Sequence, residues 1–259
     1  MADVDIKPMT PENISRYGVC GYKNVEKHEE LRNKIQWYKE NYPKGLRIMA
    51  LISKKDGYQG MIEYITGEYA YRPVDAKGYM FIHCLFVGFK KEYKEQGYAS
   101  SLIGECIKEA RAAGLNGVAV VTRKGPFMAG DKIFLKNGFH LIDSTEPDFD
   151  LLALKFNDFV QDPKFKIMDG LLSTDFSKGL TIIRSVQCPY TLKNVKAIVE
   201  TAEREYGIGV RLIDIKDATQ AQMSPCAFGT FCLIHDGEVL SYHPISKARF
   251  KNIMKKRLG

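Results

Sequence analysis

The segment from residue 79 to residue 114 constrains the fold more than any other part of the sequence. It starts with nine mostly apolar residues, YMFIHCLFV (79–87), which indicate a buried strand. A basic loop follows, and from Gly97 to Ala113 apolar residues then recur at helical spacing while charged residues occupy the opposite positions. This pattern predicts a helix with one buried face, ended by Gly114. The residues expected to point inward are Ala99, Leu102, Ile103, Cys106, Ile107 and Ala110.

Shorter patterned segments on either side complete a first domain. Helices are expected over 26–43, which holds the single Trp, and over DKIFLK (131–136). Besides 79–87, strands are expected at 46–52, 60–65, 117–122, 139–143 and 151–156. The order helix-β-β-β-α-β-α-β-β predicts an α/β fold class with a mixed-sheet layered domain.

The pattern stops near residue 157 and restarts at Leu180. Residues 157–179 alternate charges, Pro and Gly without a sustained period, which is typical of a boundary. We therefore expect a first domain over residues 1–158, a linker over 159–178 and a smaller second domain over 179–259. No internal repeat relates the two halves.

The second half predicts the order β-α-β-loop-β-β-α. Strands are expected at 180–186, 210–215, 230–235 and 238–243, the last two joined by Asp236-Gly237, a hairpin signal. One helix follows CPYT (188–191) and stops at Gly207, with Leu192, Val195, Ile198, Val199, Ala202 and Tyr206 along its apolar face. A last helix starts from Ser246, with Phe250, Ile253, Met254 and Leu258 expected inward.

Composition excludes several classes of protein. The hydrophobic content of 45% is that of a globular chain, no apolar run approaches the ~18 residues that span a bilayer, and the N-terminus lacks the regions of a signal peptide. We expect a cytoplasmic protein without membrane contact, with six free cysteines and no metal site. The formal charge of +7 suits an anionic ligand or an ordinary basic surface. Nucleic acid is not an expected partner, and a homodimer stays open.

The join between strand and helix at 86–103 is a candidate anion site. The first turn of a helix presents unpaired backbone N–H groups and the positive end of the helix dipole. Here that turn opens with GYAS (97–100), whose small residues allow an anion close to the backbone, and Lys90, Lys91 and Lys94 add positive charge. Many helix starts look like this without a ligand, so a structural role stays open on this pattern alone.

Two motifs in the expected order resemble the GNAT superfamily of acetyl-CoA-dependent N-acetyltransferases. KEQGYA (94–99) is similar to its Arg/Gln-x-x-Gly-x-Gly/Ala signature, and IFLKNGFHLID (133–143) is similar to the apolar-Tyr-x-Lys-x-Gly-Phe segment that closes its domain. The order of elements from about residue 3 to residue 157 also resembles that domain. The resemblance implies that acetyl-CoA enters a splay between strands 79–87 and 117–122.

The resemblance also implies a set of coenzyme-binding residues, with two departures. Backbone groups of Phe86 and Val87 would hold the pantetheine, and the backbone amides from Gln96 to Ser100 would hold the pyrophosphate. Lys94 replaces the usual Arg or Gln and supplies charge without a bidentate fork. Phe134 stands where many members have the Tyr that protonates the departing thiolate, so another group or water would deliver that proton, or the thiolate leaves without it. The full expected set is Phe86, Val87, Lys94, Glu95, Gln96, Gly97, Tyr98, Ala99, Ser100 and Phe134.

His83 is the candidate base, because acetyl transfer needs the attacking amine to be neutral. Alternation along 79–87 puts four residues on the face that leads to the coenzyme, namely Phe81, His83, Leu85 and Val87. In some members of the family a histidine on this strand serves as base, but a structural histidine fits equally well. Glu63 and Glu68 are further candidates, as base or as anchors for a cationic acceptor, and both also fit as charges at a sheet edge.

CPYT in the second half resembles the active-site turn of a thioredoxin-like fold that has lost its resolving cysteine. Thr191 occupies that place, and Gly229-Thr230 occupies the place of the family's cis-Pro-Thr, so a general disulfide reductase is not expected. Cys188, expected at a helix N-terminus, would be a nucleophile or thiol sensor with Cys226 as its only sensible partner. Both also fit as small packing residues. Over its full length the chain resembles the YoaP-like architecture.

Two functions follow from these expectations. The favoured one is an acetyl-CoA-dependent N-acetyltransferase that transfers acetyl directly to an amine acceptor, with the second domain assisting recognition of that acceptor. Its candidate catalytic residues are His83, Glu63 and Cys188. The alternative is an acyl-CoA-binding, redox-responsive protein that reacts through Cys188 with little or no acetyl transfer. The sequence does not identify the acceptor amine.

Overall fold

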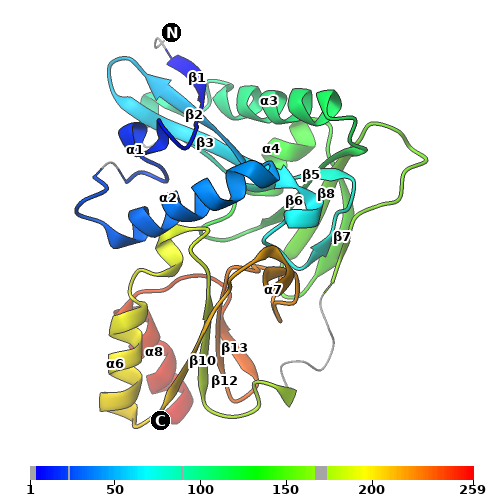
Figure 1. Cartoon of the computed structure of the whole chain (residues 1–259). Coiled ribbons are helices and arrows are strands. Elements are labelled where there is room, and N and C mark those ends of the chain that lie inside the picture. The colour runs from blue at the N-terminus through cyan, green and yellow to red at the C-terminus, as the bar shows by residue number, and fades with distance from the viewer. Residues whose placement is uncertain (1–3, 23, 89, 167–173) are drawn as a thin grey trace. The chain divides into compact units, whose positions relative to one another are not determined.

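The computed structural model describes residues 4–22, 24–88, 90–166 and 174–259 (Figure 1). Contacts divide these residues into two units. The first holds the described residues within Met1–Ala70 and Val74–Phe165, and the second those within Tyr71–Pro73 and Lys166–Gly259. Within the described ranges, no helix is long and apolar enough to cross a membrane.

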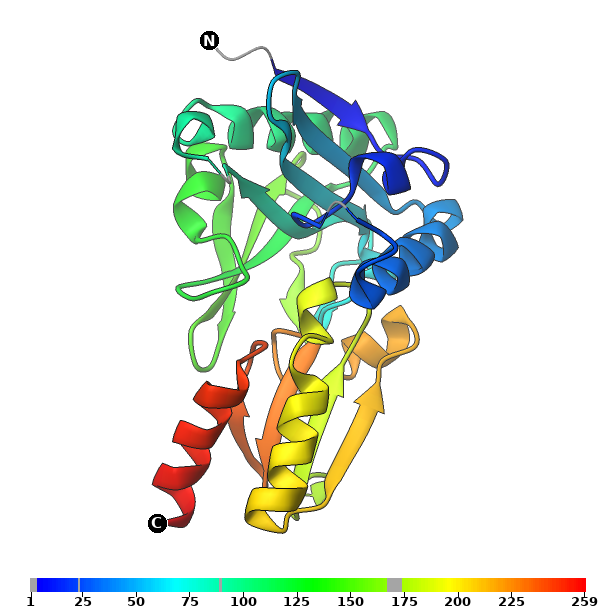
Figure 2. The same ribbon diagram turned by 90° about the vertical axis from the view of Figure 1, so that its left-hand side faces the viewer.

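A seven-stranded mixed sheet forms the first unit, in the order β1-β2-β3-β5-β6-β8-β7 (Figures 1 and 2). Neighbouring strands are antiparallel except β5 and β6, which are parallel. A separate antiparallel pair joins β4 and β9. The strands are β1 Val4–Pro8, β2 Arg47–Ser53, β3 Gly57–Thr66, β4 Val74–Asp75, β5 Tyr79–Val87, β6 Gly117–Arg123, β7 His140–Thr145, β8 Phe149–Lys155 and β9 Lys164–Phe165.

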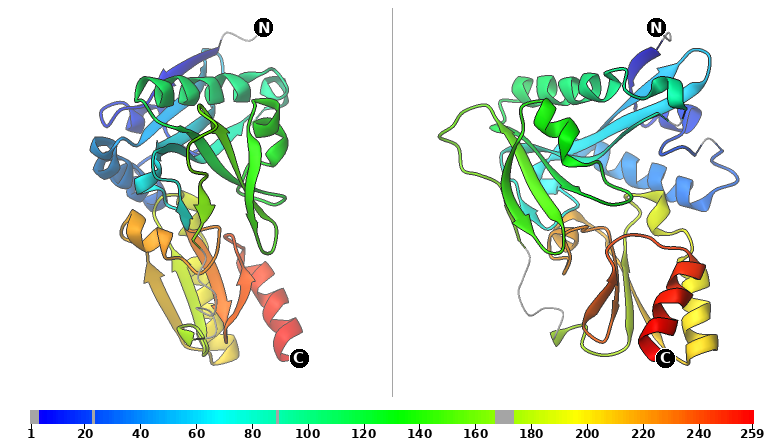
Figure 3. Two further views of the ribbon diagram at one scale, coloured as in Figure 1. Left: turned by 90° about the vertical axis from the view of Figure 1, so that its right-hand side faces the viewer. Right: turned by 180° about the vertical axis from the view of Figure 1, so that it is seen from behind.

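Helices cover both faces of this sheet (Figure 3). They are α1 Ile14–Tyr17, α2 Glu29–Asn41, α3 Tyr98–Ala112 and α4 Asp131–Lys136, with 3₁₀ turns at Tyr42–Lys44, Gly67–Tyr69 and Lys91–Tyr93. The apolar face of α3 packs with Phe134 of α4 on Ile62, Ile82 and Leu85 of the sheet, as its periodicity predicts. On the opposite face α2 meets the sheet through Lys34, which contacts Glu63 of β3.

β5 and β6 diverge halfway along their length. Their parallel pairing runs only from Tyr79–Gly117 to Ile82–Val120, whereas β5 continues to Val87 and β6 to Arg123. Backbone groups of β5 beyond Ile82 that face β6 are therefore outside this ladder. This opening agrees with the splay expected between the two strands.

On its other edge, β5 carries a β-bulge at His83. In the ladder with β3, Glu63 is opposite Cys84 and Tyr64 is opposite Ile82, so His83 is the extra residue. The bulge reverses the alternation, because Ile82 and Leu85 both join the core under α3. The expected grouping of His83 with Leu85 and Val87 on one face is therefore wrong.

The second unit is a four-stranded sheet in the order β11-β10-β12-β13. β10 is parallel to β11 and antiparallel to β12. On one side α6 and α8 pack together, with the rings of Tyr206 and Phe250 6.2 Å apart. Asp236 and Gly237 both have positive φ angles, as a tight hairpin requires. The elements are β10 Leu180–Arg184, a 3₁₀ turn Pro189–Thr191, α6 Val195–Tyr206, β11 Val210–Asp214, α7 Ala218–Gln222, β12 Phe231–His235, β13 Glu238–Ser241 and α8 Lys247–Leu258.

Long patterned elements match their predictions, and short polar ones do not. β5 has the predicted bounds, and α3 starts and ends one residue inside them. β1 (VDIKP) and α7 (ATQAQ) are missing from the predicted order, because neither has a sustained apolar period. Leu258, expected inward, is 53% exposed at the last residue of α8.

The division of the chain differs from the expected boundaries. Residues 164–165, inside the expected linker, form β9 and belong to the first unit. Tyr71–Pro73, from the middle of the first half, belong to the second unit. Residues 167–173 of the expected linker lie outside the described residues.

Candidate active site

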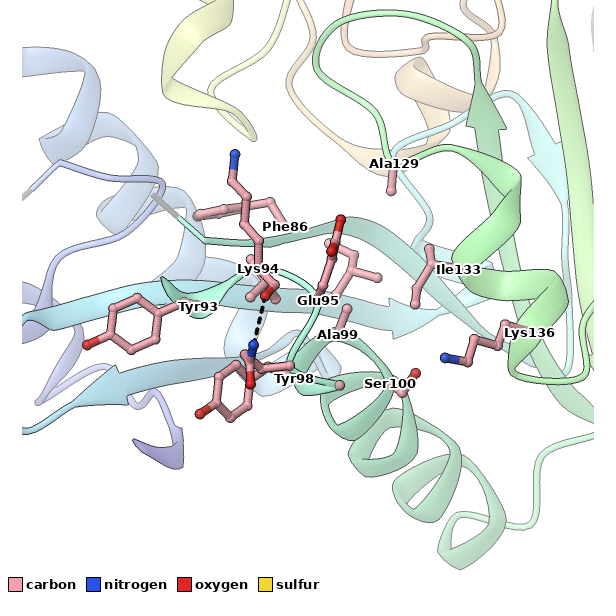
Figure 4. A pocket seen from close by; sticks show the side chains of 14 residues that line it. Phe86, Tyr93, Lys94, Glu95, Tyr98, Ala99, Ser100, Ala129, Ile133 and Lys136 are labelled. Atoms are coloured by element: carbon pink, nitrogen blue, oxygen red, sulfur yellow. Dashed lines mark hydrogen bonds between the residues drawn. The ribbon is translucent and has the colours of Figure 1, made fainter. Parts of the chain in front are cut away.

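A cavity of about 450 Å³ lies where β5 diverges, beside the first turn of α3 (Figure 4). Nine of the ten expected coenzyme-binding residues line it, and Phe134 is the exception. Sequence reasoning missed five lining residues: Leu85, Tyr93, Ala129, Ile133 and Lys136. The complete lining is Leu85, Phe86, Val87, Tyr93, Lys94, Glu95, Gln96, Gly97, Tyr98, Ala99, Ser100, Ala129, Ile133 and Lys136.

Gly97 turns the chain into α3 with a backbone conformation that favours glycine. Its φ is 81°, in the left-handed region, and a Cβ there would meet no atom within 4 Å. This backbone conformation by itself favours glycine here. The first helical bond runs from the Ser101 N–H to the Gly97 carbonyl, at 3.0 Å. The amides of residues 98–100 precede that bond and have no acceptor within the helix, which suits them to an anion.

Two lysines bring positive charge to this cavity, Lys94 from the loop and Lys136 from the last turn of α4 (Figure 4). Asn137 Nδ2 donates to Ser100 Oγ at 3.0 Å and so ties the end of α4 to the start of α3. Lys90, expected to add charge, instead pairs with Asp56. Lys136 is the lysine of the second GNAT-like motif, and that signal was sufficient to find it.

Phe134 lies in the core. It is fully buried, and its ring meets that of Phe139 edge-on, with centroids 5.5 Å apart. It lines a second, small cavity of about 10 Å³ between the diverging strands. A phenyl ring has no proton to donate, so this position supplies no acid.

His83 lies at the same small cavity, between β5 and β6. The two cavities share Leu85 and Ala129 in their linings, so the position of His83 is next to the larger cavity. The lining of the small cavity is Ile82, His83, Cys84, Leu85, Val120, Val121, Phe127, Met128, Ala129 and Phe134. Among these described residues, only His83 and Cys84 carry a titratable side chain.

His83 belongs to a buried cluster with two charged side chains. The Lys34 ammonium donates to Glu63 Oε2, and His83 Nδ1 lies 3.3 Å from Glu63 Oε1. All three side chains are 0% exposed. Burial acts to raise the pKa of Glu63, but the charge of Lys34 and the contact with His83 outweigh it and hold that pKa at about 2. Glu63 is therefore a carboxylate across the physiological range.

The two carboxylates singled out from the sequence differ in their surroundings. Glu63 is in β3, between β2 and β5, so its interpretation as a sheet-edge charge is wrong. Neither cavity has Glu63 in its described lining. Glu68 is exposed, and its Oε1 accepts a hydrogen bond from the Gly78 N–H at 3.0 Å. Glu68 thus stabilises the loop that contains Gly78.

The CPYT turn is held by Thr191. Its side chain is buried, and its hydroxyl lies within hydrogen-bond distance of the carbonyls of Ser185 and Cys188. Cys188 is half-buried and precedes a three-residue 3₁₀ turn, whereas α6 begins only at Val195. A helix dipole acts within its first turn, so α6 does not give Cys188 the expected support.

Cys226 is buried and contacts another thiol, that of Cys232 on β12. The Cys226 Sγ is 3.4 Å from the Phe231 carbonyl oxygen. Burial, together with the hydrogen bond to Cys226, raises the pKa of the Cys232 thiol well above its usual range. Cys232 is thus a further neighbour of Cys226 that the spacing of the cysteines does not reveal.

Comparison with known proteins finds a curated relative for most of the chain. Residues 210–252 match the model of the YoaP-like family. Over 249 residues the chain is 29% identical to a Bacillus subtilis (strain 168) protein named uncharacterized N-acetyltransferase YoaP, and the match covers 95% of this chain and 96% of that protein.

Solved structures that resemble part of the chain include two acetyltransferases. One is the PaiA N-acetyltransferase from Thermoplasma acidophilum in complex with coenzyme A, at 16% identity and a TM-score of 0.41, over 60% of this chain and 99% of that one. Another is the GNAT family N-acetyltransferase YhbS from Escherichia coli in complex with CoA, at 13% identity and a TM-score of 0.40, over 64% and 91%.

Proposed function

We propose that the chain is an acetyl-CoA-dependent N-acetyltransferase that transfers the acetyl group directly to an amine. The observation that carries this proposal is the cavity at the diverging edge of β5, which combines a strand edge, helix-start amides and two lysines. The name of the 29% identical relative supports the same class of reaction.

The cavity offers the coenzyme two kinds of contact. Backbone groups of Phe86 and Val87, outside the β5–β6 ladder, pair with the pantetheine as an added strand would. The amides of residues 98–100 receive the pyrophosphate, and Lys94 and Lys136 balance its charge. Glu95 and Gln96 complete the loop that borders it.

His83 is the proposed base. The amine nitrogen attacks the thioester carbonyl carbon, its proton passes to His83 Nε2, and the carbon–sulfur bond breaks. The departing thiolate takes a proton from water, since Phe134 offers none, and the hydroxide that this leaves takes the proton back from His83. The products are the acetylated amine and the coenzyme thiol. Glu63 acts through its contact with His83, because it is absent from the described lining of both cavities.

The second unit is proposed to be a thioredoxin-like module that helps to recognise the acceptor. Its sheet order β11-β10-β12-β13 and its succession β-α-β-α-β-β-α support that fold. We place the main domain boundary within 159–178, and the change of unit between Phe165 and Lys166 supports this placement. The buried Thr191 supports a structural role for the CPYT turn.

Release of coenzyme thiol in the presence of different amines tests the proposal. The wild type, His83→Ala and Cys188→Ser are compared with a polyamine, free amino acids, an aminoglycoside and a lysine-containing peptide. We expect turnover with one of these amines. His83→Ala should lower kcat/KM by about 100-fold while coenzyme binding is retained, because a positioned base contributes roughly that factor. Cys188→Ser should keep the wild-type rate.

A different result would favour the thiol-reactive alternative. Absence of turnover with every amine, together with one-to-one labelling of Cys188 at neutral pH, would contradict the acetyltransferase proposal. Loss of turnover in Cys188→Ser, with a normal rate in His83→Ala, would indicate that Cys188 in the second unit carries out the reaction.

A further inference from the structure

Lys34 is the unexplained member of the buried cluster at the α2 face of the sheet. Its side chain is 0% exposed, its ammonium donates to Glu63, and it lies over the Trp37 ring at 4.2 Å from the centroid. Burying an ammonium and a carboxylate together costs free energy that an apolar pair would avoid, so such a pair is weak evidence of stabilisation. A role in the site is an alternative reason for its presence.

The cluster connects α2 to the small cavity through a single chain of contacts. Glu63 bridges Lys34 on one oxygen and His83 Nδ1 on the other. His83 in turn lines the small cavity, which shares lining residues with the larger one. Because Nδ1 faces the carboxylate, Nε2 is the ring nitrogen that would accept a proton from a substrate amine.

The net charge of the cluster determines the protonation states of Glu63 and His83. With Lys34 and Glu63 both ionised, their charges compensate each other and the buried imidazole is stable as a neutral ring. Without the ammonium, the carboxylate would attract one more proton onto the Glu63–His83 pair, because a net negative charge is costly in this apolar place. That extra proton would compete with the lone pair on Nε2.

We propose that Lys34 is a positioning residue for His83: by compensating Glu63 it keeps the imidazole neutral, with its proton on Nδ1 and none on Nε2. This inference rests on the proposed function for its catalytic consequence. Its structural part, the protonation of His83, can be measured without turnover.

The other groups around the cluster do not provide this charge. Tyr38 of α2 and Tyr58 of β3 interact with Glu63, and burial, followed by neighbouring charge, raises the pKa of both phenols, so both are neutral. On β5, Phe81 meets His83 edge-on at 5.8 Å and Cys84 is the adjacent thiol. Lys34, by contrast, places an ammonium in direct contact with Glu63.

The pH dependence of kcat/KM distinguishes positioning from simple structural support. Lys34→Met, which keeps the length of the side chain, should lower kcat/KM at neutral pH by about 10-fold or more and move the acid limb upward by about one pH unit or more. Lys39→Met, at an exposed position of the same helix, is the control and should leave the profile unchanged. The double variant Lys34→Met/Glu63→Gln removes both charges and should return the acid limb to its wild-type position.

Nitrogen NMR of the histidine ring gives a readout that does not require the proposed function. With ¹⁵N-histidine, the His83 signal, assigned by its loss in His83→Gln, should show the Nδ1–H neutral form in the wild type and in the double variant. Lys34→Met should show a protonated Nε2 at neutral pH. If these spectra appear but no amine is acetylated, the proposed function fails while the assignment of Lys34 stands.

Two results would overturn the inference. One is a folded Lys34→Met variant whose His83 spectrum and acid limb match the wild type. The other is a double variant in which Nε2 stays protonated or the acid limb stays shifted, and this result is decisive even if Lys34→Met does not fold.

Discussion

At the scale of single residues, Glu63 is a charged side chain enclosed by the protein. It is fully buried, and its pKa of about 2 lies below its usual value of 4.5. A carboxyl whose pKa is lowered by folding stabilises the folded state above its unfolded pKa, and this contribution is lost as pH falls toward the folded pKa. The sensitive window is therefore between about pH 5 and pH 2.

We predict that the free energy of unfolding falls steeply across that window and that Glu63→Gln flattens the fall. Glu63→Gln should also be less stable than the wild type at neutral pH, because it leaves the ammonium of Lys34 buried without its counterion, a loss of roughly 3 kcal/mol. Urea unfolding at several pH values measures both effects. The exposed Glu92→Gln is the control, and an equal slope in both variants would contradict the prediction.

Lys136 makes a second residue-scale prediction, on coenzyme affinity. Lys136 lines the larger cavity, whereas Lys132 of the same short helix is exposed and outside that lining. Lys136→Ala should raise the Kd for coenzyme A about 5-fold, since a solvent-accessible charge contact contributes roughly 1 kcal/mol. Lys132→Ala should leave the Kd unchanged. Calorimetric titration at low and high salt measures this, and equal effects of the two substitutions would remove Lys136 from the site.

At the scale of elements, the close approach of β3 to β5 positions the coenzyme edge. Gly60 is opposite Val87, and a Cβ on Gly60 would lie 2.6 Å from the Phe86 carbonyl oxygen. Gly60→Ala should force the strands apart and lower both stability and coenzyme affinity. Gly104→Ala in α3 is the control. The added methyl group meets no atom within 4 Å, so this substitution should stabilise the protein by about 1 kcal/mol with unchanged affinity. Thermal unfolding measures the stability of both variants, and titration with coenzyme A measures their affinity. Unchanged stability and affinity in Gly60→Ala would contradict the tight contact between the strands.

At the scale of the whole molecule, one short segment belongs to a unit far from it in sequence. Within the second unit, Gly229 has a φ of 75°, and a Cβ there would lie 2.9 Å from Arg72 Cα and from the Tyr71 carbonyl oxygen. Arg72 also places its guanidinium over the Phe228 ring at 5.4 Å. Glycine at this position thus has a local reason, since a bulkier residue would displace residues 71–73.

Gly229→Ala should therefore destabilise the second unit by roughly 2 kcal/mol, through both strain at positive φ and the displaced segment. Gly209→Ala, with no atom within 4 Å, is the matched control and should be nearly neutral. Hydrogen exchange of the β10 and β12 amides reports on this unit separately from the rest of the chain. Equal protection in the two variants would show that the segment is dispensable.

The sequence by itself determined the features that depend on local periodicity. The apolar spacing of α3, the uninterrupted strand β5 and the hairpin at Asp236-Gly237 follow from neighbours a few residues apart. Nine of the ten expected coenzyme residues line one cavity because they form a continuous strand–loop–helix segment, whose geometry is largely local. Lys136 lies within the second motif, but its place in the cavity was not predicted.

The tertiary structure alone decided which side chains meet across the sheet. The extra residue at His83 appears only in the register of β5 against β3, so alternation along one strand assigns the wrong face. Lys34 and Glu63 are 29 residues apart, and a lysine on an otherwise amphipathic helix carries no sign that it is buried. Burial and charge pairing are long-range properties, because they depend on which elements pack together, and a local pattern does not contain that information.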